Sequence, residues 1–381
     1  MTALPRPDVD PDGLLEYSVV YTDRALNHMS RRFVGVVQAI VDVLTEAYAA
    51  DRVALVPGGG SYAMESIARQ LATGRRCLVV RNGLFSFRWS AILERGVSDD
   101  VTVCKARPLD ADDVQSAWAP APIDEVEATI AEQRPEVVFA PHVETAAGMI
   151  LPDDYLARLA AATHAVGGLF VLDCIASGAA WVDMRALGVD VLVSAPQKGW
   201  SGSPGVGFVM LTDAAAAVVQ ERTGSSFSLD LARWLDITDG YRDGRHAYHT
   251  TMPTDAMATT AESLLATRAM GFARARAAQE DLGARVRALL VERGYPSVAA
   301  PGFEAPGVVV VHTSDPEQKS GAAFARVGVQ AAGGVPLQCD EPAGFSTFRI
   351  GLFGLDKLGD VDGTVERLAR ALDRLADAQH A

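Results

Sequence analysis

The 381-residue chain is 49% hydrophobic and 22% charged, a composition typical of a globular protein with one large domain and one smaller one. Its formal net charge of −14 argues against nucleic acid or an anionic membrane surface as a partner. The four cysteines are scattered without a Cys-x-x-Cys pair, which argues against a metal site or a disulfide framework and favours a reducing compartment.

The N-terminal residues give no sign of a targeting or membrane segment. They are acidic and proline-rich, unlike a signal peptide, and the chain contains no run of about 18 uncharged apolar residues. We therefore expect a cytoplasmic protein in which residues 1–30 form an N-terminal arm. Within this arm, the segment Tyr17–Ser30 is dense in polar and aromatic groups. It is either a solvated loop or a segment that lines a site or grips a partner subunit.

Residues 31–255 are predicted to form a large α/β domain. Apolar spacing over residues 31–49 suits an amphipathic helix, and from residue 52 short apolar strands alternate with helices. Such alternation implies a mostly parallel sheet covered by helices. The predicted strands are Val53–Val56, Cys77–Val80, Val101–Cys104, Val137–Ala140, Leu169–Leu172, Val191–Val193 and Val206–Leu211. The predicted helices are Tyr62–Leu71, Ser86–Glu94, Ile123–Glu132 and Asp153–Ala165, with a helical turn at Met184–Leu187.

Residues 256–381 are predicted to form a smaller C-terminal α+β domain. A long helical stretch over residues 255–293 precedes two strand candidates, Gly307–His312 and Phe345–Ile350, and an amphipathic helix over Val361–Ala378 ends the chain. Ligands of parallel sheets bind beyond the carboxyl ends of the strands. The residues that follow the large-domain strands are therefore the candidates for a site.

Lys198 follows one of these strands, in the sequence VLVSAPQKGWSGSPG. An ammonium group is costly to bury, and joining it to pyridoxal phosphate (PLP) as an imine is one way to compensate. The alternative is a surface lysine in a glycine-rich loop. Asp173 ends another apolar strand, and is either a helix N-cap or the carboxylate that PLP needs at its ring nitrogen.

Three further groups have both a structural and a functional interpretation. The turn Gly58-Gly59-Gly60-Ser61 opens a helix and suits an anion, although Ser61 could serve only as a helix cap. Phe85 could stack on a flat ring or belong to the core. Arg349 lies in an apolar strand and is either part of a structural salt bridge or a bidentate clamp for a substrate carboxylate.

Together these motifs resemble class V PLP-dependent aminotransferases of the alanine/serine–glyoxylate type. The resemblance covers roughly residues 28–375. It rests on GGGSYAME (58–65), RNGLF (81–85), HVETAAG (142–148), VLDCIASG (171–178), SAPQKGWSGSPG (194–205), AYHTTMP (247–253) and FRIGLFG (348–354). It implies fold type I, PLP as cofactor and a homodimer whose active site is shared between subunits. It also implies transfer of an amino group from a small amino acid to a 2-oxo acid, glyoxylate or pyruvate, by a ping-pong mechanism.

The resemblance also implies a role for each matching residue. Lys198 would form the internal aldimine and carry the proton between Cα and C4′, Asp173 would bind the pyridine nitrogen, and Arg349 would hold the substrate carboxylate. The remaining expected cofactor contacts are Phe85 and Ile175 on the two ring faces, Thr145 at the ring hydroxyl, Gly59, Gly60, Ser61 and Gln197 around the phosphate, and Tyr248 and Thr251 reaching the phosphate of the neighbouring subunit.

Three departures from the family pattern concern substrate recognition and the phosphate turn. YSVVYTDRALNHMS replaces the usual Gly-Pro-Gly-Pro start, the phosphate turn lacks one hydroxyl, and the ETAAG run keeps only the hydroxyl of Thr145. The amino donor therefore stays open. Four residues are candidates for binding a second acidic group of the substrate: Arg24, Arg88, Arg245 and His246.

Two alternatives to transamination remain at this stage. One is a PLP-dependent lyase of the same fold, acting by desulfuration, β-elimination or decarboxylation. A desulfurase would need a reactive cysteine, and Cys339 is the candidate, although its acidic neighbours should raise its pKa. The other is a non-catalytic protein of this fold, which the presence of both Lys198 and Asp173 argues against.

Overall fold

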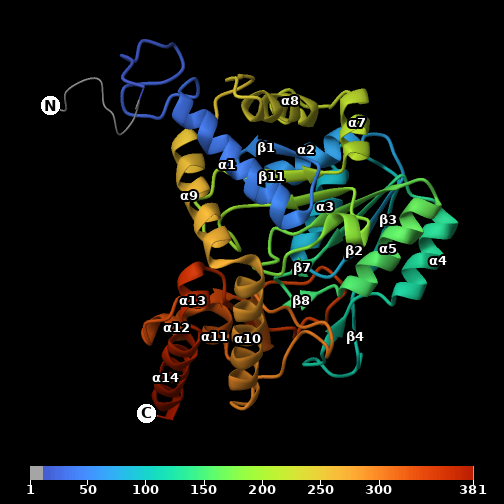
Figure 1. The fold of residues 1–381 in the computed structure, drawn as a ribbon. Helices are drawn as coiled ribbons and strands as arrows, with labels where there is room; N and C mark the ends of the chain where they lie inside the picture. Colours follow the sequence, from blue (N-terminus) through green and yellow to red (C-terminus); the bar gives the residue numbers. More distant parts are fainter. Residues whose placement is uncertain (1–11, 381) are drawn as a thin grey trace.

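A computed structural model describes residues 12–380 (Figure 1). Of the predicted N-terminal arm, residues 1–11 lie outside this described part. The centre of the molecule is a seven-stranded sheet in the order β1-β11-β10-β9-β6-β2-β3, in which only β11 runs antiparallel to its neighbours. The strands are β1 (Arg52–Pro57), β2 (Cys77–Arg81), β3 (Val101–Lys105), β6 (Val137–Pro141), β9 (Leu169–Asp173), β10 (Val191–Ser194) and β11 (Val206–Leu211).

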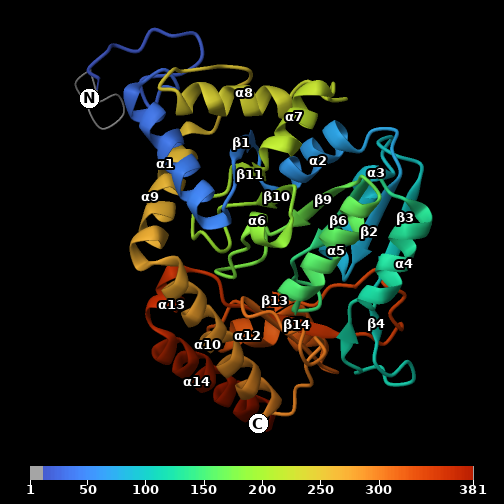
Figure 2. The same cartoon turned by 45° about the vertical axis from the view of Figure 1, so that its right-hand side comes forward.

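Helices cover this sheet, as the strand–helix alternation predicts. In Figures 1 and 2, α1, α8 and α9 lie together at one side of the molecule, while α4 and α5 lie side by side at another. The helices are α1 (Arg31–Tyr48), α2 (Gly60–Leu71), α3 (Leu84–Leu93), α4 (Ile123–Gln133), α5 (Asp153–Ala165), α6 (Met184–Leu187), α7 (Asp213–Glu221), α8 (Leu231–Arg242) and α9 (Thr254–Met270). None of the helices in residues 12–380 is long and apolar enough to cross a membrane.

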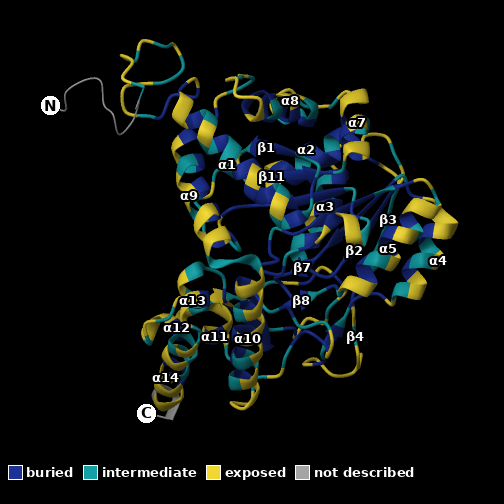
Figure 3. Ribbon diagram, in the orientation of Figure 1, coloured by how far each residue is buried: buried dark blue, intermediate teal, exposed yellow. Residues whose placement is uncertain are grey.

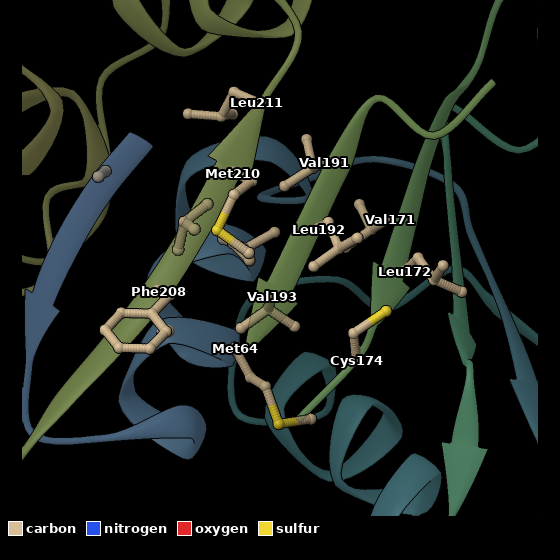
Figure 4. Packing of buried hydrophobic residues seen from close by; sticks show 14 of the residues in the cluster. Met64, Val171, Leu172, Cys174, Val191, Leu192, Val193, Phe208, Met210 and Leu211 are labelled. Atoms are coloured by element: carbon tan, nitrogen blue, oxygen red, sulfur yellow. The ribbon is translucent and has the colours of Figure 1, made fainter. Parts of the chain in front are cut away.

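The core lies between the sheet and its helices. Strands β2, β6, β10 and β11 are buried along their whole length, because helices on both faces leave no side of the strand for water (Figure 3). Figure 4 shows Met64 of α2 gathered with side chains of β9, β10 and β11 in one hydrophobic cluster. This packing fixes where each strand ends, and hence where the loops beyond the strands begin.

The C-terminal part of the chain contains a second, antiparallel sheet in the order β12-β14-β13. Figure 2 shows this part below the large sheet, on the side where β2, β6 and β9 end. Its elements are α10 (Phe272–Val291), β12 (Val308–His312), α11 (Pro316–Ser320), α12 (Ala322–Arg326), β13 (Ala332–Gly333), β14 (Thr347–Gly351), α13 (Leu355–Gly359) and α14 (Val361–His380).

The structure corrects the sequence predictions in a few places. The stretch over residues 255–293 is not one helix, because Gly271 with φ of +91° separates α9 from α10. Helices α7 and α8 were not predicted, nor were the short hairpins β4 (Arg107–Pro108) with β5 (Trp118–Ala119) and β7 (Val143–Glu144) with β8 (Met149–Ile150). The domain boundary at residue 255 stays a prediction; this residue lies in the first turn of α9, which packs on α1.

Gly207 of β11 lies where the sheet meets the start of α2. A Cβ atom added at this residue would lie 2.5 Å from the Cβ of Ala63 and 2.7 Å from the carbonyl oxygen of Gly59. Real Cβ atoms essentially never come within 3.0 Å of such neighbours, and backbone gives way less readily than a flexible side chain. The absence of a side chain therefore lets the turn before α2 sit against the sheet.

We expect Gly207→Ala to lower the free energy of unfolding by about 1–3 kcal/mol, the usual cost of overpacking a core. Urea unfolding measures the change. Gly35→Ala is the matched control, because Gly35 is an exposed residue within α1 whose added Cβ would meet nothing within 4 Å. It should raise stability by about 0.5–1 kcal/mol. Equal stability of Gly207→Ala and wild type would contradict this tight packing.

Candidate active site

Several of the predicted site residues follow parallel strands, whereas Arg349 lies within β14 of the smaller sheet. Asp173 ends β9 and is in register with Val193 of the neighbouring strand β10, whose continuation carries Lys198. Phe85 follows β2 as the second residue of α3. The sheet therefore brings together residues far apart in the sequence, as expected for the carboxyl edge of a parallel sheet.

Lys198 lies in a loop held by backbone hydrogen bonds. The N–H groups of Ser201 and Gly202 donate to the carbonyl oxygens of Lys198 and Pro196 over 3.1 and 2.9 Å. Gly199 lies so close to the backbone of Gly178 that an added Cβ would be 2.3 Å from its carbonyl oxygen. Burial lowers the pKa of the Lys198 amine, and Asp173 and Glu144 partly oppose this effect. Lys198 is half-buried, which does not fit a fully solvated lysine of a surface loop.

The ring of Phe85 is the centre around which the cationic groups gather. Lys198 Nζ lies 5.4 Å from the ring centroid, Arg349 Cζ 5.6 Å and Arg88 Cζ 4.7 Å. Phe353 brings a second ring within 5.9 Å of Lys198 Nζ. Among residues 12–380, none of the three cations forms an ion pair with a carboxylate. The cluster thus has positive charge available for anionic ligands.

Asp173 is a buried carboxylate with one oxygen still available. Its Oδ1 accepts a hydrogen bond from Ile175 N over 2.9 Å, and its second oxygen accepts none from the described residues. Burial raises the pKa of Asp173 to about 6, and Lys198 only partly opposes the rise. A cation placed against the free oxygen would favour the charged form.

The glycine turn adopts backbone conformations that L-residues with side chains rarely adopt. Gly58 and Gly59 have φ of +121° and +146°, and Gly58 N donates to Gly205 O over 2.8 Å, which ties the turn to the end of the lysine loop. Gly60 has no room for a Cβ, because Ile175 Cδ1 would lie 2.6 Å away. Gly59 is the N-cap of α2, so the interpretation of Ser61 as the helix cap is wrong. The Ser61 hydroxyl instead lies 3.2 Å from Arg88 Nη1.

Two polar groups at the site have no partner within the described chain. The Thr145 hydroxyl is buried, yet no described residue hydrogen-bonds to it. Arg349 donates through Nε to Gly333 O over 2.9 Å, and its two terminal nitrogens bond to none of residues 12–380. The structural salt bridge considered for Arg349 is therefore wrong within this part of the chain. A buried polar group without a partner is costly, so the Thr145 hydroxyl suits a bound ligand. The half-buried Arg349 leaves two donor nitrogens open for one.

Other predicted residues form no side-chain hydrogen bond, ion pair or ring contact with this cluster in residues 12–380. Gln197 is exposed beside Lys198, while Tyr248 and Thr251 are exposed and lie next to each other, with 3.4 Å between their hydroxyl oxygens. Of the four candidates for a second acidic group, only Arg88 reaches the ring of Phe85. Arg245 pairs with Asp243, His246 lies beside the ring of His28, and Arg24 is exposed.

Cys339, the candidate for a desulfurase, is buried and 4% exposed. Its thiol lies 3.3 Å from the carbonyl oxygen of Arg81. Burial, together with the charges of Glu144 and Glu341, raises the pKa of Cys339 to about 12. A buried thiol in its protonated form is a poor nucleophile, so the structure does not favour desulfuration.

Sequence reasoning missed three buried residues of the site. Ser86 Oγ donates to Glu144 Oε2 at the start of α3. The backbone N–H of His142 donates to Asp173 O over 2.8 Å, and His142 Nδ1 lies 2.7 Å from Ser177 Oγ. Burial lowers the pKa of His142 to about 3, so its ring is neutral. The HVETAAG motif contains both His142 and Glu144. The signal that could have identified Glu144 is a charged residue directly after the apolar Val143, in the segment that forms the buried strand β7.

Comparisons with known proteins agree with this geometry. The family model for class-V aminotransferases matches residues 20–324. The 2-aminoethylphosphonate–pyruvate transaminase 2 of Paraburkholderia xenovorans is 29% identical over 364 residues, which cover 93% of this chain and 90% of that protein. The 2-aminoethylphosphonate–pyruvate transaminase of Paraburkholderia phymatum is 28% identical over 389 residues and covers 97% of this chain and 98% of its own.

Solved structures show the same fold. The alanine–glyoxylate aminotransferase of Nostoc sp. superposes with a TM-score of 0.77 at 22% identity, covering 92% of this chain and 88% of that one. The aspartate aminotransferase of Thermus thermophilus superposes with a TM-score of 0.75 at 24% identity, covering 92% and 93%. At such identities the likeness concerns the fold, which is fold type I with a mostly parallel sheet.

The chain belongs to the class V aminotransferase family. It is a PLP-dependent aminotransferase, which confirms the predicted family, fold class, reaction type and cofactor. The residues present fit PLP, because Asp173 has a free oxygen, the Thr145 hydroxyl lacks a partner, and the cations around Phe85 lack carboxylates. The individual roles of these residues remain predictions.

Asp173 should destabilise the protein when no cofactor is bound. Its pKa is about 6 in the folded chain against 3.8 for an ordinary aspartate, so ionising it in the folded state costs about 3 kcal/mol. The native state binds the extra proton, and the penalty therefore grows from pH 3.8 to pH 6 and is constant above.

We expect cofactor-free Asp173→Asn to be more stable than cofactor-free wild type at pH 8, by up to about 3 kcal/mol. The difference should shrink as the pH falls toward 4, and excess PLP should reverse the order at pH 8. Thermal unfolding with and without PLP measures both effects. Asp99→Asn, which changes an exposed carboxylate, is the control. A cofactor-free Asp173→Asn that is less stable than wild type at pH 8 would contradict the buried, ionised carboxylate.

Proposed function

We propose that the protein transfers the amino group of a small amino acid to pyruvate or glyoxylate, with Lys198 as the catalytic base and Arg349 as the carboxylate clamp. One observation carries this proposal: the Lys198 amine and the Arg349 guanidinium lie on the same ring, 5.4 and 5.6 Å from the centroid of Phe85. The relatives named above support pyruvate as acceptor, since pyruvate is part of their names.

Bound PLP supplies an electron sink for the carbon that loses its proton. Asp173 would keep the ring nitrogen protonated through its free oxygen, and Thr145 would hydrogen-bond the ring hydroxyl. Phe85 and Ile175 would enclose the ring from its two faces. Gly59, Gly60, Ser61 and Gln197 would hold the phosphate, where the N-terminus of α2 adds a favourable dipole.

Lys198 would move the proton once its amine is free. Burial lowers the pKa of this amine, which favours the neutral form that a general base needs near neutral pH. Arg349 would bind the carboxylate of the donor and then that of the acceptor in the same place. Because one clamp serves both, the two substrates bind in turn and the kinetics are ping-pong.

We further propose a cytoplasmic homodimer in which Tyr248 and Thr251 reach the cofactor phosphate of the partner subunit. Both side chains are exposed, and in the described part of their own chain neither forms a hydrogen bond or ring contact with the cluster around Phe85. The predicted arm supports their segment from beneath, since the hydroxyl of Tyr21 donates to Met252 O over 3.0 Å and the rings of His28 and Tyr248 lie 5.3 Å apart. Tyr21 and His28 of the arm segment thus contact the loop, while Tyr17 and Val19 of the same segment are exposed.

Adding an amino donor alone should convert the visible absorbance of the wild-type holoenzyme to that of the pyridoxamine form. Lys198→Ala should lose at least about a hundredfold in rate, the usual contribution of a general base. Stopped-flow absorbance with alanine, serine and 2-aminoethylphosphonate as donors measures this, with pyruvate and glyoxylate as acceptors. Lys319→Ala, which changes an exposed lysine, should behave as wild type. Full activity of Lys198→Ala would refute the proposal.

Mixing two inactive variants tests the shared site. Lys198→Ala subunits keep Tyr248 and Thr251, whereas subunits with Tyr248→Phe and Thr251→Ala keep the lysine. After unfolding and refolding together in equal amounts, half of the dimers are mixed and carry one intact site, so about one quarter of wild-type activity should return. Each variant refolded alone is the control. No gain on mixing would show that each site is built within one subunit.

A further inference from the structure

We infer that Glu144 is a positioning residue for this reaction, one that fixes Phe85 against the cofactor and supplies a negative charge shared by Lys198 and Arg349. The inference rests on the proposed function, because it concerns the same site. It starts from a carboxylate that is 0% exposed and forms no direct ion pair within residues 12–380, although its charge acts on Lys198 and Arg349 from a greater distance. A buried charge of this kind is costly and needs another source of stabilisation.

Hydrogen-bond donors from two segments surround the Glu144 carboxylate. Its Oε1 accepts from Phe85 N over 3.3 Å and from Ala146 N over 2.9 Å. Its Oε2 accepts from Ser86 N over 2.8 Å and from Ser86 Oγ over 2.7 Å. Three of these four donors belong to the first turn of α3, where the helix dipole also favours a negative charge.

The donor set explains why this residue is a glutamate. An amide in place of the carboxylate would turn one oxygen into an NH₂ group, which would then face N–H donors whichever way it pointed. The chain also leaves room for the carboxylate at Gly83, where an added Cβ would lie 2.7 Å from Glu144 Cδ. The donor set and the space at Gly83 together attach the start of α3 to Glu144 in β7.

This attachment reaches the site through Phe85. The backbone N–H of Phe85 is bound directly, and Ser86 also accepts hydrogen bonds from Asn82 N and Gly83 N over 2.9 and 3.1 Å. The loop from β2 to α3 is thereby fixed at consecutive residues. Because Lys198, Arg88 and Arg349 all lie on the ring of Phe85, a shift of this loop would displace the surface that all three share.

The charge of Glu144 acts on the same groups. It raises the pKa of Lys198 and of Arg349, which burial lowers, and it adds to the raised pKa of Asp173. The other charged groups that act on Lys198 are Asp173, which raises its pKa, and Arg88 and Arg349, which lower it. Removing the charge of Glu144 leaves the amine with two cations and one anion.

Glu144→Gln and Glu144→Asp separate the two parts of the role. Glu144→Gln removes the charge and mismatches the donors, so we expect the dissociation constant for PLP to rise roughly tenfold or more. The pH midpoint of the visible absorbance of the bound cofactor, which reports the proton on the Lys198 nitrogen, should fall by about one unit. Glu144→Asp keeps the charge but is one methylene too short, so binding should weaken while the midpoint stays near that of wild type.

Asp230→Asn is the matched control, because Asp230 is also a carboxylate that accepts from a helix N-terminus, at Arg233 N in α8. It should leave the PLP dissociation constant and the midpoint unchanged. Unchanged values in Glu144→Gln would overturn the inference, as would weaker binding with no shift of the midpoint, since a purely structural residue would give that result.

Should Glu144→Gln fail to fold, Glu144→Asp and Ser86→Ala decide the matter, because each weakens the attachment and keeps the charge. Wild-type affinity for PLP in both would overturn the inference. A wild-type protein that binds no PLP would instead refute the proposed function, so the two failures are distinguishable.

Discussion

The site depends on positive charge that the chain leaves without carboxylate partners. Lys198, Arg88 and Arg349 lie within 5.6 Å of the centroid of one phenylalanine ring, and no ion pair within residues 12–380 neutralises them. Isolated from ligands, such a cluster repels itself in a medium of reduced dielectric constant. A cofactor phosphate and a substrate carboxylate are the anions that would relieve this repulsion, so the same arrangement that disfavours the empty site favours the occupied one.

Close backbone approaches make this cluster possible. Ile175 occupies the space above Gly60, the carboxylate of Glu144 occupies that beside Gly83, and the backbone of Gly178 comes against Gly199. In each case a Cβ atom would lie less than 3.0 Å from its neighbour. The glycines of the motifs therefore do more than permit unusual turns. They bring the loops that follow β1, β2, β6, β9 and β10 close enough for their side chains to act on one ligand.

The sequence allowed the sheet and the lysine–aspartate pair to be predicted because each depends on a local signal. Apolar runs marked the seven strands, and Asp173 and Lys198 were charged residues at the ends of such runs. Glu144 lacked such a signal, because what distinguishes it is the set of hydrogen-bond donors that meet it in space. Tyr248 and Thr251 were predicted only through the family resemblance, and Arg88 only as one of four candidates, because no local pattern distinguishes them. Helix α8 was missed although Trp234 and Leu235 are fully buried, because its polar residues weaken the helical pattern.

Two buried carboxylates at one site are stabilised in different ways, and the difference separates their roles. Glu144 is surrounded by four donors of its own chain, so its charge is balanced before any ligand arrives. Asp173 receives one hydrogen bond, and burial leaves its pKa near 6. The first carboxylate can therefore hold a surface in place, whereas the second would gain a full partner from the cation of the bound cofactor in its proposed role. Glu144 thus holds the loop that carries the ring of Phe85 without help from a ligand. Within residues 12–380, Asp173 keeps an unpaired oxygen that a ligand could use.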